Sequence, residues 1–205
     1  MVAAAVELAD EEGIDSLSMR KLAQALGVEA MSLYHHVANK DDLLDGMVDV
    51  VFGEVDLPAA GSPWQPEIRR RCTSLRSVLL SHPWAVARLD SRRSPGMATL
   101  QHHDAVIGCL RSGGFTVRGA AQAFAVIDAY VLGFVVQQLA LPMEPGEDTA
   151  ELATEILASA PPDSLPHLAE MAVEYVGLPD YAFADEFEPG LDLVLDALDR
   201  QRRTR

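Results

Sequence analysis

Residues 18–40 have the sequence SMRKLAQALGVEAMSLYHHVANK, and this stretch decides the fold of the chain. Apolar residues at helical spacing predict a helix over 19–26, with Ser18 as its N-cap and Gly27 as its end. A second short helix is predicted from Glu29 to Val37. Two short helices joined by a glycine turn are typical of a helix-turn-helix, whose second helix enters the major groove of DNA.

The segments on either side complete a small helical head. Residues 2–12 place their apolar side chains mostly on one face, which predicts a helix that ends at Gly13. Asn39 is expected to cap a further helix from Lys40 to about Val55. The apolar stripe of this helix comprises Leu43, Leu44, Met47, Val50 and Val51.

A linker rich in proline, glycine and alanine at 57–63 separates the head from a larger body. Helical patterns follow over about 64–81, 84–90, 97–112, 116–141, 148–159, 163–177 and 188–203. No segment shows the alternation of a β-strand. We therefore expect an all-α fold, with a helix-turn-helix DNA-binding domain over 1–55 and a helical effector-binding and dimerisation domain over 64–205.

The overall charge limits the kinds of nucleic-acid binding that are plausible. The chain has 205 residues and a formal charge of −15, which argues against a general nucleic-acid coat. Within 18–40, however, three basic residues face only Glu29, so this segment carries a net charge of +2. A small basic island suits weak binding by one head and the use of two heads in a dimer.

Several other classes of protein are not expected. No apolar run reaches the roughly 18 residues of a membrane span, and the first residues lack the basic segment of a signal peptide. Cys72 and Cys109 lie far apart inside predicted helices, which favours reduced buried thiols in a cytoplasmic protein. No nucleophile elbow, HExxH, P-loop or CxxC motif is present, so we expect neither an enzyme nor a bound metal or cofactor.

The stretch from Met19 to Leu44 closely resembles the signature of the tetracycline-repressor family of transcription regulators. The matching residues are Arg20-Lys21-Leu22-Ala23, Leu26-Gly27-Val28, Leu33-Tyr34, His36-Val37, Asn39-Lys40 and Leu43-Leu44. The resemblance is close over 1–55, and it implies a homodimer that binds double-stranded operator DNA. Release of a repressor by a small-molecule effector is the expected mode of action. Activation stays an alternative, because the sequence does not show where the operator lies.

The resemblance also implies which residues contact DNA. Arg20 would contact a base edge or a phosphate, and Lys40 would pair with a phosphate. Tyr34 and His36 would hold the phosphate backbone. The complete DNA-binding set that the resemblance implies is Arg20, Glu29, Ser32, Leu33, Tyr34, His36 and Lys40.

The second helix differs from that of the founding member of the family. Glu29 would open this helix and Ser32 would lie in the groove, whereas Leu33 would pack either against a thymine methyl or in the core of the head. Ala30 and Met31 replace a glutamine and a proline of the founding member. We therefore expect a different operator sequence.

The body resembles the tetracycline repressors more loosely, from Trp64-Gln65 through Gly114-Phe115 to Leu132-Gly133. In those repressors a histidine ligates the magnesium ion of the bound drug, and this resemblance implies that Leu89 replaces it here. Arg71 likewise replaces an asparagine and Leu75 a phenylalanine. Tetracycline–magnesium is therefore not the expected effector.

A cavity for another small molecule is still expected. The segment 116–141 is nearly all apolar, with Asp128 as a lone acid among apolar neighbours. A buried carboxylate needs a partner, which could be Arg71, His103 or a polar group of a ligand; a structural ion pair or an exposed position is the alternative. Trp84 could line the cavity or belong to the core. The predicted ligand-binding residues are Arg71, Leu75, Trp84, His103, Phe124, Asp128 and Gln137.

Two helices are expected to form the dimer interface. The apolar run Val131–Val136 is one surface, and the other is the stripe Leu191, Val194, Leu195 and Leu198. Together they predict a four-helix bundle between two chains. A ligand in the body would favour a head separation that no longer matches the operator half-sites, with the helix over 40–55 carrying the shift. The alternative class is a helical ligand-binding or interaction protein whose head has lost DNA binding. The acidic flanks and Ala30 keep this alternative open.

Overall fold

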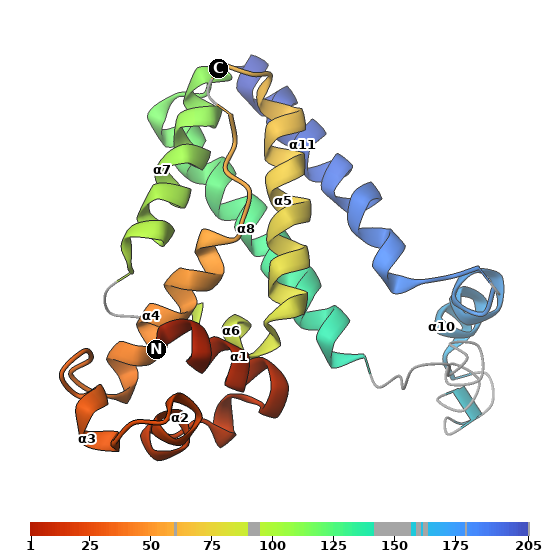
Figure 1. Ribbon diagram of the computed structural model, residues 1–205. Coiled ribbons are helices and arrows are strands. Elements are labelled where there is room, and N and C mark those ends of the chain that lie inside the picture. The colour runs from red at the N-terminus through yellow and green to blue at the C-terminus, as the bar shows by residue number, and fades with distance from the viewer. Residues whose placement is uncertain are drawn as a thin grey trace. The chain divides into compact units, whose positions relative to one another are not determined.

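Helices make up the regular structure of the part of the chain that the structure describes (Figure 1). The computed structural model describes residues 1–59, 61–89, 95–141, 157–158, 161, 164–178 and 180–204. The chain divides into two compact units, Met1–Val136 together with Val194–Arg205, and Gln137–Leu193. The expected all-α fold is confirmed.

The head begins as the sequence predicts. It contains α1 (Val2–Glu12), the 3-10 turn η1 (Ile14–Ser16), α2 (Met19–Leu26) and α3 (Ala30–Leu33). Gly13 has φ 81° and Gly27 has φ 66°, which is a backbone region that glycine enters without strain. The Ser18 hydroxyl accepts a hydrogen bond from the Lys21 N–H at 3.2 Å, so Ser18 caps α2 as predicted.

The second helix of the motif is shorter than predicted. α3 ends at Leu33, whereas the sequence predicted a helix that continues to Val37. The chain goes on in tight turns, in which the His36 N–H donates to the Leu33 carbonyl at 2.9 Å. Two histidines and a β-branched valine favour helix only weakly, and the chain must turn before Asn39 can cap the next helix.

α4 (Lys40–Gly53) links the head to the body. The Asn39 side chain accepts a hydrogen bond from the Asp42 N–H at 2.9 Å, so the predicted cap is confirmed. Val50 was predicted to be part of the apolar stripe, but its side chain is 39% exposed. Val48 is buried instead, because it lies four residues after Leu44 and so shares its face. α4 packs on α1 and on α7 (Met97–Ser112).

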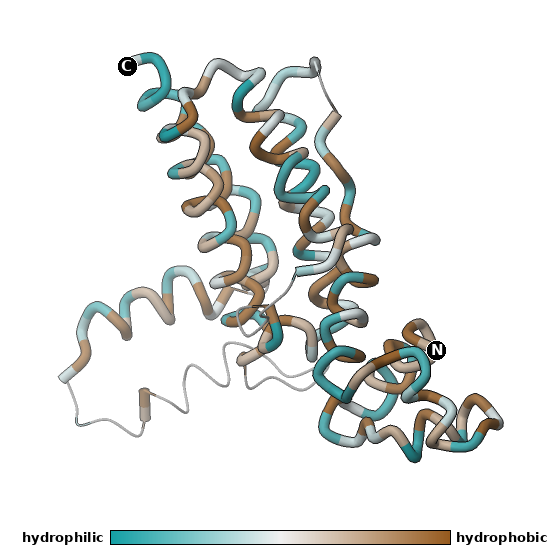
Figure 2. Tube along the Cα trace, turned by 90° about the vertical axis from the view of Figure 1, so that its left-hand side faces the viewer, coloured by the Kyte–Doolittle hydropathy of each residue, from teal (hydrophilic) through white to brown (hydrophobic). Residues whose placement is uncertain are grey.

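The body is built from long helices whose ends lie close to the predicted ones. α5 (Trp64–Ser81), α6 (Pro83–Val86), α7 and α8 (Val117–Ala140) follow the linker, and α6 covers only the first part of the helix predicted over 84–90. Figure 2 shows hydrophobic and hydrophilic positions alternating along these helices. Their hydrophobic positions form much of the buried core of the first unit, which includes Ile68, Leu79, Val106, Leu110 and Ile127.

The second unit contains short helical segments and the start of the last helix. These are α10 (Pro166–Met171), the π-helical turn η3 (Ala172–Val176), the 3-10 turn η4 (Phe183–Glu186) and α11 (Phe187–Arg203), whose residues from Val194 belong to the first unit. α10 with η3 corresponds to the helix predicted over 163–177, and α11 to that over 188–203. Most of the helix predicted over 148–159 lies outside the described residues.

Most of the apolar residues that were predicted to face a partner chain are already buried within one chain. Val131 and Val135 of α8 are fully buried, and most members of the stripe on α11 are buried as well: Leu191, Leu195 and Leu198. α8 exposes Val136 of the predicted run, together with Ala125, Val126 and Ala129 outside it. The prediction is therefore wrong for these buried residues, because apolar periodicity does not reveal whether a face is covered by its own chain.

α8 also corrects the expectation that no segment is apolar enough to span a membrane. By length and composition alone this helix meets that criterion, with a mean hydropathy of 1.7 over an 18-residue window. Core helices of soluble proteins meet the same criterion. Asp128, in the middle of α8, is paired with a buried arginine, as described below.

Candidate DNA-binding surface and ligand cavity

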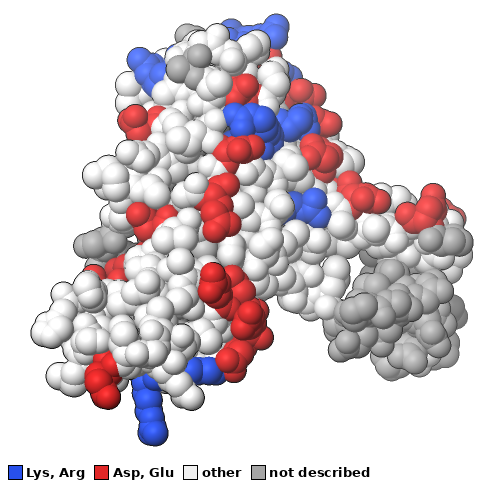
Figure 3. All heavy atoms as spheres, viewed as in Figure 1, with Lys and Arg blue, Asp and Glu red and all other residues white. Residues whose placement is uncertain are grey.

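The helix-turn-helix places several of the predicted DNA-contacting side chains on the surface. Arg20 on α2 is exposed, as are Tyr34 and His36 after α3. Figure 3 shows basic groups at the lower end of the visible face, where α2 lies in Figure 1, with acidic groups beside them. Side chains exposed in this way are free to contact phosphates and base edges.

The two neighbouring basic residues of α2 differ in their surroundings. Lys21 forms an ion pair with Glu12 of α1, whereas Arg20 has no ion pair or hydrogen bond with any residue that the structure describes. Glu12 lies outside the window 18–40 in sequence but beside Lys21 in space. The net charge of +2 counted over that window therefore overstates the free positive charge.

Lys40 and Ser32 use part of their hydrogen-bonding capacity inside the head. Lys40 Nζ donates to the Leu17 carbonyl at 2.7 Å, which leaves two of the three ammonium protons for other acceptors. The Ser32 hydroxyl donates to the Glu29 carbonyl at 2.7 Å, so its oxygen can still accept. Glu29 itself is exposed at the start of α3.

Leu33 supports the recognition helix from the inside. Its side chain is 3% exposed, and Val37 one turn later is also buried. Of the two roles that the sequence left open, the structure favours packing in the core of the head over contact with a thymine methyl. Leu33 is therefore removed from the set of DNA-contacting residues.

A cavity of about 250 Å³ in the first unit has walls contributed by α4, α5, α7 and α8. Its lining consists of Phe52, Leu75, Leu89, Pro95, Thr99, His103, Phe124, Asp128 and Leu132. Four predicted ligand-binding residues meet here, namely Leu75, His103, Phe124 and Asp128. The ring of His103 contacts that of Phe124 edge-on at 5.1 Å and lies 6.3 Å from that of Phe52.

Phe52 and Thr99 of this lining were not among the residues predicted from the sequence. Phe52 belongs to α4, which the sequence assigned to the head, and apolar periodicity does not distinguish a core residue from one that lines a cavity. Thr99 lies in the first turn of α7, and nothing in its local sequence indicates a site. Both residues reach the cavity only because α4 packs on α7.

A buried polar cluster lies behind the wall of the cavity. Arg71 of α5 is fully buried, and its Nη1 lies 2.7 Å from Asp128 Oδ1. Arg71 Nε donates to His102 Nε2 at 2.9 Å. Burial, assisted by the charge of Arg71 and by the neighbouring His103, lowers the pKa of His102 to about 3, so this ring is neutral and accepts through Nε2.

This cluster identifies the partner of the Asp128 carboxylate. Arg71 was one of three partners considered for its carboxylate, and it is the residue that pairs with it. Arg71 does not line the cavity, whereas Asp128 does and is 22% exposed. The cavity therefore presents a carboxylate whose charge is balanced from behind by a buried guanidinium.

Two predicted ligand-binding residues lie elsewhere. The Trp84 indole donates to Asp10 Oδ1 at 2.6 Å, so Trp84 anchors α6 to α1 and does not line the cavity. Gln137 is exposed and belongs to the second unit. The sequence could not separate these residues from the others, because both follow ordinary helical patterns.

His82 joins three elements close to Trp84. Its Nδ1 lies 2.8 Å from Asp10 Oδ1 of α1, and its Nε2 lies 3.1 Å from Glu54 Oε2 at the end of α4. Only the doubly protonated ring can donate to both carboxylates. Burial opposes that charge, but the hydrogen bonds and charges of Asp10 and Glu54 outweigh it and raise the pKa of His82 above 6.5.

We expect this cluster to make the stability of the protein depend on pH. Because the pKa of His82 is raised on folding, its contribution is fully present below the unfolded value of 6.5 and is lost as pH rises through the folded pKa. Urea unfolding of the wild type and of His82→Gln at about pH 6 and about pH 8.5 measures the difference. We expect the two proteins to differ more at the lower pH; a difference that grows with pH contradicts the charged assignment.

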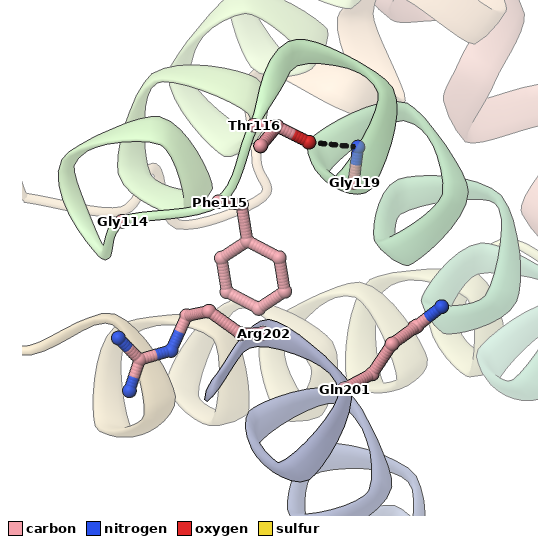
Figure 4. A pocket seen from close by; sticks show the side chains of 6 residues that line it. All are labelled: Gly114, Phe115, Thr116, Gly119, Gln201 and Arg202. Carbon is pink, nitrogen blue, oxygen red and sulfur yellow. Dashed lines mark hydrogen bonds between the residues drawn. The ribbon is translucent and has the colours of Figure 1, made fainter. Parts of the chain in front are cut away.

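A second, smaller cavity lies at the turn between α7 and α8 (Figure 4). The Thr116 hydroxyl accepts a hydrogen bond from the Gly119 N–H at 3.0 Å and so caps the start of α8. Phe115 contacts Trp64 edge-on at 4.9 Å. Figure 4 shows Gln201 and Arg202 directed away from each other, and Arg202 is bound to Asp199 at 2.6 Å. These groups do not converge on a ligand, so we assign this turn a structural role.

Known proteins share this arrangement. Residues 1–47 match the family described as "Bacterial regulatory proteins, tetR family", and residues 57–202 match "Tetracyclin repressor-like, C-terminal domain". Tetracycline repressor protein class D of Escherichia coli is 33% identical over 207 residues, a match that covers 97% of this chain and 90% of that repressor. An HTH-type transcriptional regulator of Saccharopolyspora erythraea is 45% identical over 136 residues, which cover 66% of this chain and 58% of that regulator.

A solved structure agrees over nearly the whole chain. ActR of Streptomyces coelicolor in complex with actinorhodin superposes with a TM-score of 0.82 at 30% sequence identity. The match covers 98% of this chain and 95% of ActR. At this level of identity the likeness extends to the sequence as well as to the fold.

Proposed function

The chain belongs to the tetracycline-repressor family of bacterial regulatory proteins, which are ligand-responsive DNA-binding transcription factors, and from this premise we propose that it is a dimeric cytoplasmic repressor released from its operator by a small molecule. One observation carries the proposal. α4 begins with Lys40 beside the helix-turn-helix, and its next-to-last residue, Phe52, lies in the wall of the cavity. A ligand in the cavity therefore touches the same rigid helix that positions the head.

Operator binding is assigned to the exposed side chains of the motif. Arg20, Tyr34, His36 and the remaining donors of Lys40 are proposed to contact phosphates or base edges, with Ser32 in the groove and Glu29 at the start of α3. With so few cations per head, one head binds weakly, and two heads on one two-fold axis are needed. The division into a DNA-binding domain over 1–55 and an effector and dimerisation domain over 64–205 is part of the same proposal.

Effector binding is assigned to the cavity around Asp128. Its walls are mostly apolar or aromatic, and its partly exposed carboxylate is already balanced in charge by Arg71. These features favour a neutral ligand with an apolar ring system and one hydroxyl that donates to Asp128. A cationic ligand is disfavoured, because it would add an unbalanced charge beside Arg71.

Dimerisation is assigned to the exposed small residues of α8. Ala125, Val126, Ala129 and Val136 lie at spacings of three, four and seven residues, so they share one face along which two helices could approach closely.

We expect Ala129→Glu to sediment as a monomer and to lose operator binding, because it places two charges in the interface. Ser77→Glu, which adds the same charge on the exposed face of α5, is the matched control; a dimeric Ala129→Glu protein contradicts the assignment.

Selection of bound duplexes from a random DNA pool, followed by titration at several salt concentrations, tests the function as a whole. A regulator enriches a two-fold symmetric sequence and loses affinity steeply with salt. A chain that enriches no sequence and binds weakly at low salt supports the alternative of a ligand-binding protein with a vestigial head.

A further inference from the structure

Asp49 of α4 caps a helix that begins 48 residues later in the sequence. Asp49 Oδ1 accepts hydrogen bonds from the Thr99 N–H and the Thr99 hydroxyl, both at 2.9 Å. Its Oδ2 accepts the Ala98 N–H at 3.2 Å. The local cap position of α7 is Gly96, which has no side chain to do this. We call these three hydrogen bonds the Asp49 clasp.

The clasp joins the cavity to the helix that carries the head. Thr99 lines the cavity and is 2% exposed, so it belongs to the cavity wall and to the clasp at once. One turn later on α7, His103 also lines the cavity. On the other side, Asp49 lies about two and a half turns of helix after Lys40 on α4. A ligand that displaces the first turn of α7 must therefore stretch or break hydrogen bonds made by α4.

The Asp49 carboxylate fills the space in which a side chain at Gly96 would lie. A Cβ atom added to this glycine would overlap the Asp49 carboxylate, although the backbone conformation at Gly96 itself is open to any residue. The carboxylate also lies at the positive end of the α7 dipole, where negative charge is favoured. Electrostatics and sterics therefore both hold Asp49 against one position of α7.

Resting on the proposed function, we propose that Asp49 is the positioning residue that transmits the state of the cavity to the head. With the clasp formed, α4 is held in one orientation and the two heads keep a fixed separation. With the clasp broken, α4 samples other orientations. Part of the free energy of operator binding is then used to order α4, so the affinity falls.

Two substitutions break the clasp from opposite sides, and neither requires a known effector. Asp49→Ala removes the acceptor, and Gly96→Ala drives the carboxylate away from α7. We expect each to weaken binding to the selected operator duplex by at least about fivefold, measured by fluorescence anisotropy. The double variant is expected to lose no more than either single variant, because both remove the same interaction. Asp49→Asn, which keeps one oxygen acceptor, is expected to lose less.

Asp45→Ala is the matched control, because it removes the same charge from α4 one turn earlier and is expected to leave operator affinity within about twofold of the wild type. Leu132→Trp, which fills the cavity from α8, provides a substitute for a ligand. We expect it to weaken operator binding in the wild type and to have little further effect in Asp49→Ala. Circular dichroism and thermal unfolding serve to check that each variant is folded.

The outcomes separate the inference from the function on which it rests. Wild type that binds no selected duplex overturns the proposed function and this inference with it. If the wild type binds the operator, and Asp49→Ala and Gly96→Ala bind it equally tightly but are less stable, the inference alone is overturned. The clasp is then only a structural cap. Additive losses in the double variant also overturn it, as does tighter binding by either single variant.

Discussion

Asp128→Leu is expected to lower the free energy of unfolding by about 3 kcal/mol, because it leaves the guanidinium of Arg71 buried without its counter-charge. Arg71 is fully buried, so water cannot solvate the guanidinium when its counter-charge is removed. Its remaining partner, His102, is neutral and supplies no charge. Urea unfolding followed by circular dichroism measures the loss.

Removal of the other partner of the ion pair is expected to lower the free energy of unfolding by less. Arg71→Met leaves Asp128 unpaired, but that carboxylate is 22% exposed and can take water from the cavity. The double variant Arg71→Met/Asp128→Leu removes both charges and keeps the volumes similar, so we expect it to recover most of the stability that Asp128→Leu loses. A double variant less stable than Asp128→Leu would contradict the view that the unpaired charge is the source of the loss.

Arg20→Ala is expected to weaken operator binding by a factor on the order of 100, whereas Lys21→Ala changes it by less than about threefold. A charge-assisted hydrogen bond contributes roughly 1.5 kcal/mol or more, and a dimer loses two of them. Arg20 is exposed and unpaired within the described chain, while Lys21 is neutralised by Glu12. The two residues are adjacent in sequence and alike in charge, so only their surroundings differ.

Fluorescence anisotropy at several salt concentrations measures this difference. If Arg20 contacts phosphate, the slope of affinity against salt falls by about two for the dimer, one for each head. If it contacts a base edge, the slope changes less and discrimination at one base pair per half-site is lost. Equal losses for Arg20→Ala and Lys21→Ala would mean that the ion pair with Glu12 does not remove Lys21 from the DNA-binding surface.

The elements that the sequence predicted best are those set by local chemistry. The ends of α1, α2 and α4 follow from Gly13, Ser18, Gly27 and Asn39, whose effects act within one turn of helix. α5 and α7 begin and end where their patterns do. The recognition helix was predicted too long, because the turn after Leu33 depends on how the chain must reach Asn39 as well as on local preference.

The candidate site was only partly predictable. Leu75, His103, Phe124 and Asp128 were predicted and do line one cavity, whereas Trp84 is bound to Asp10 and does not. Phe52 and Thr99 were missed because the sequence gives no sign that α4 packs on α7. The apolar stripe of α11 was assigned to a partner chain although it is largely buried within its own.

The sequence by itself determined that this chain is all-α, that it has a helix-turn-helix head and that its family is that of the tetracycline repressors. Those conclusions rest on periodicity, caps and one long motif, which are properties of residues close together in the chain. Tertiary structure alone decided that Lys21 is paired while Arg20 has no partner among the described residues, that Arg71 balances Asp128, and that Asp49 caps α7. Each of these depends on groups brought together from distant positions, and the strength of an electrostatic contact is set by distance and burial in space.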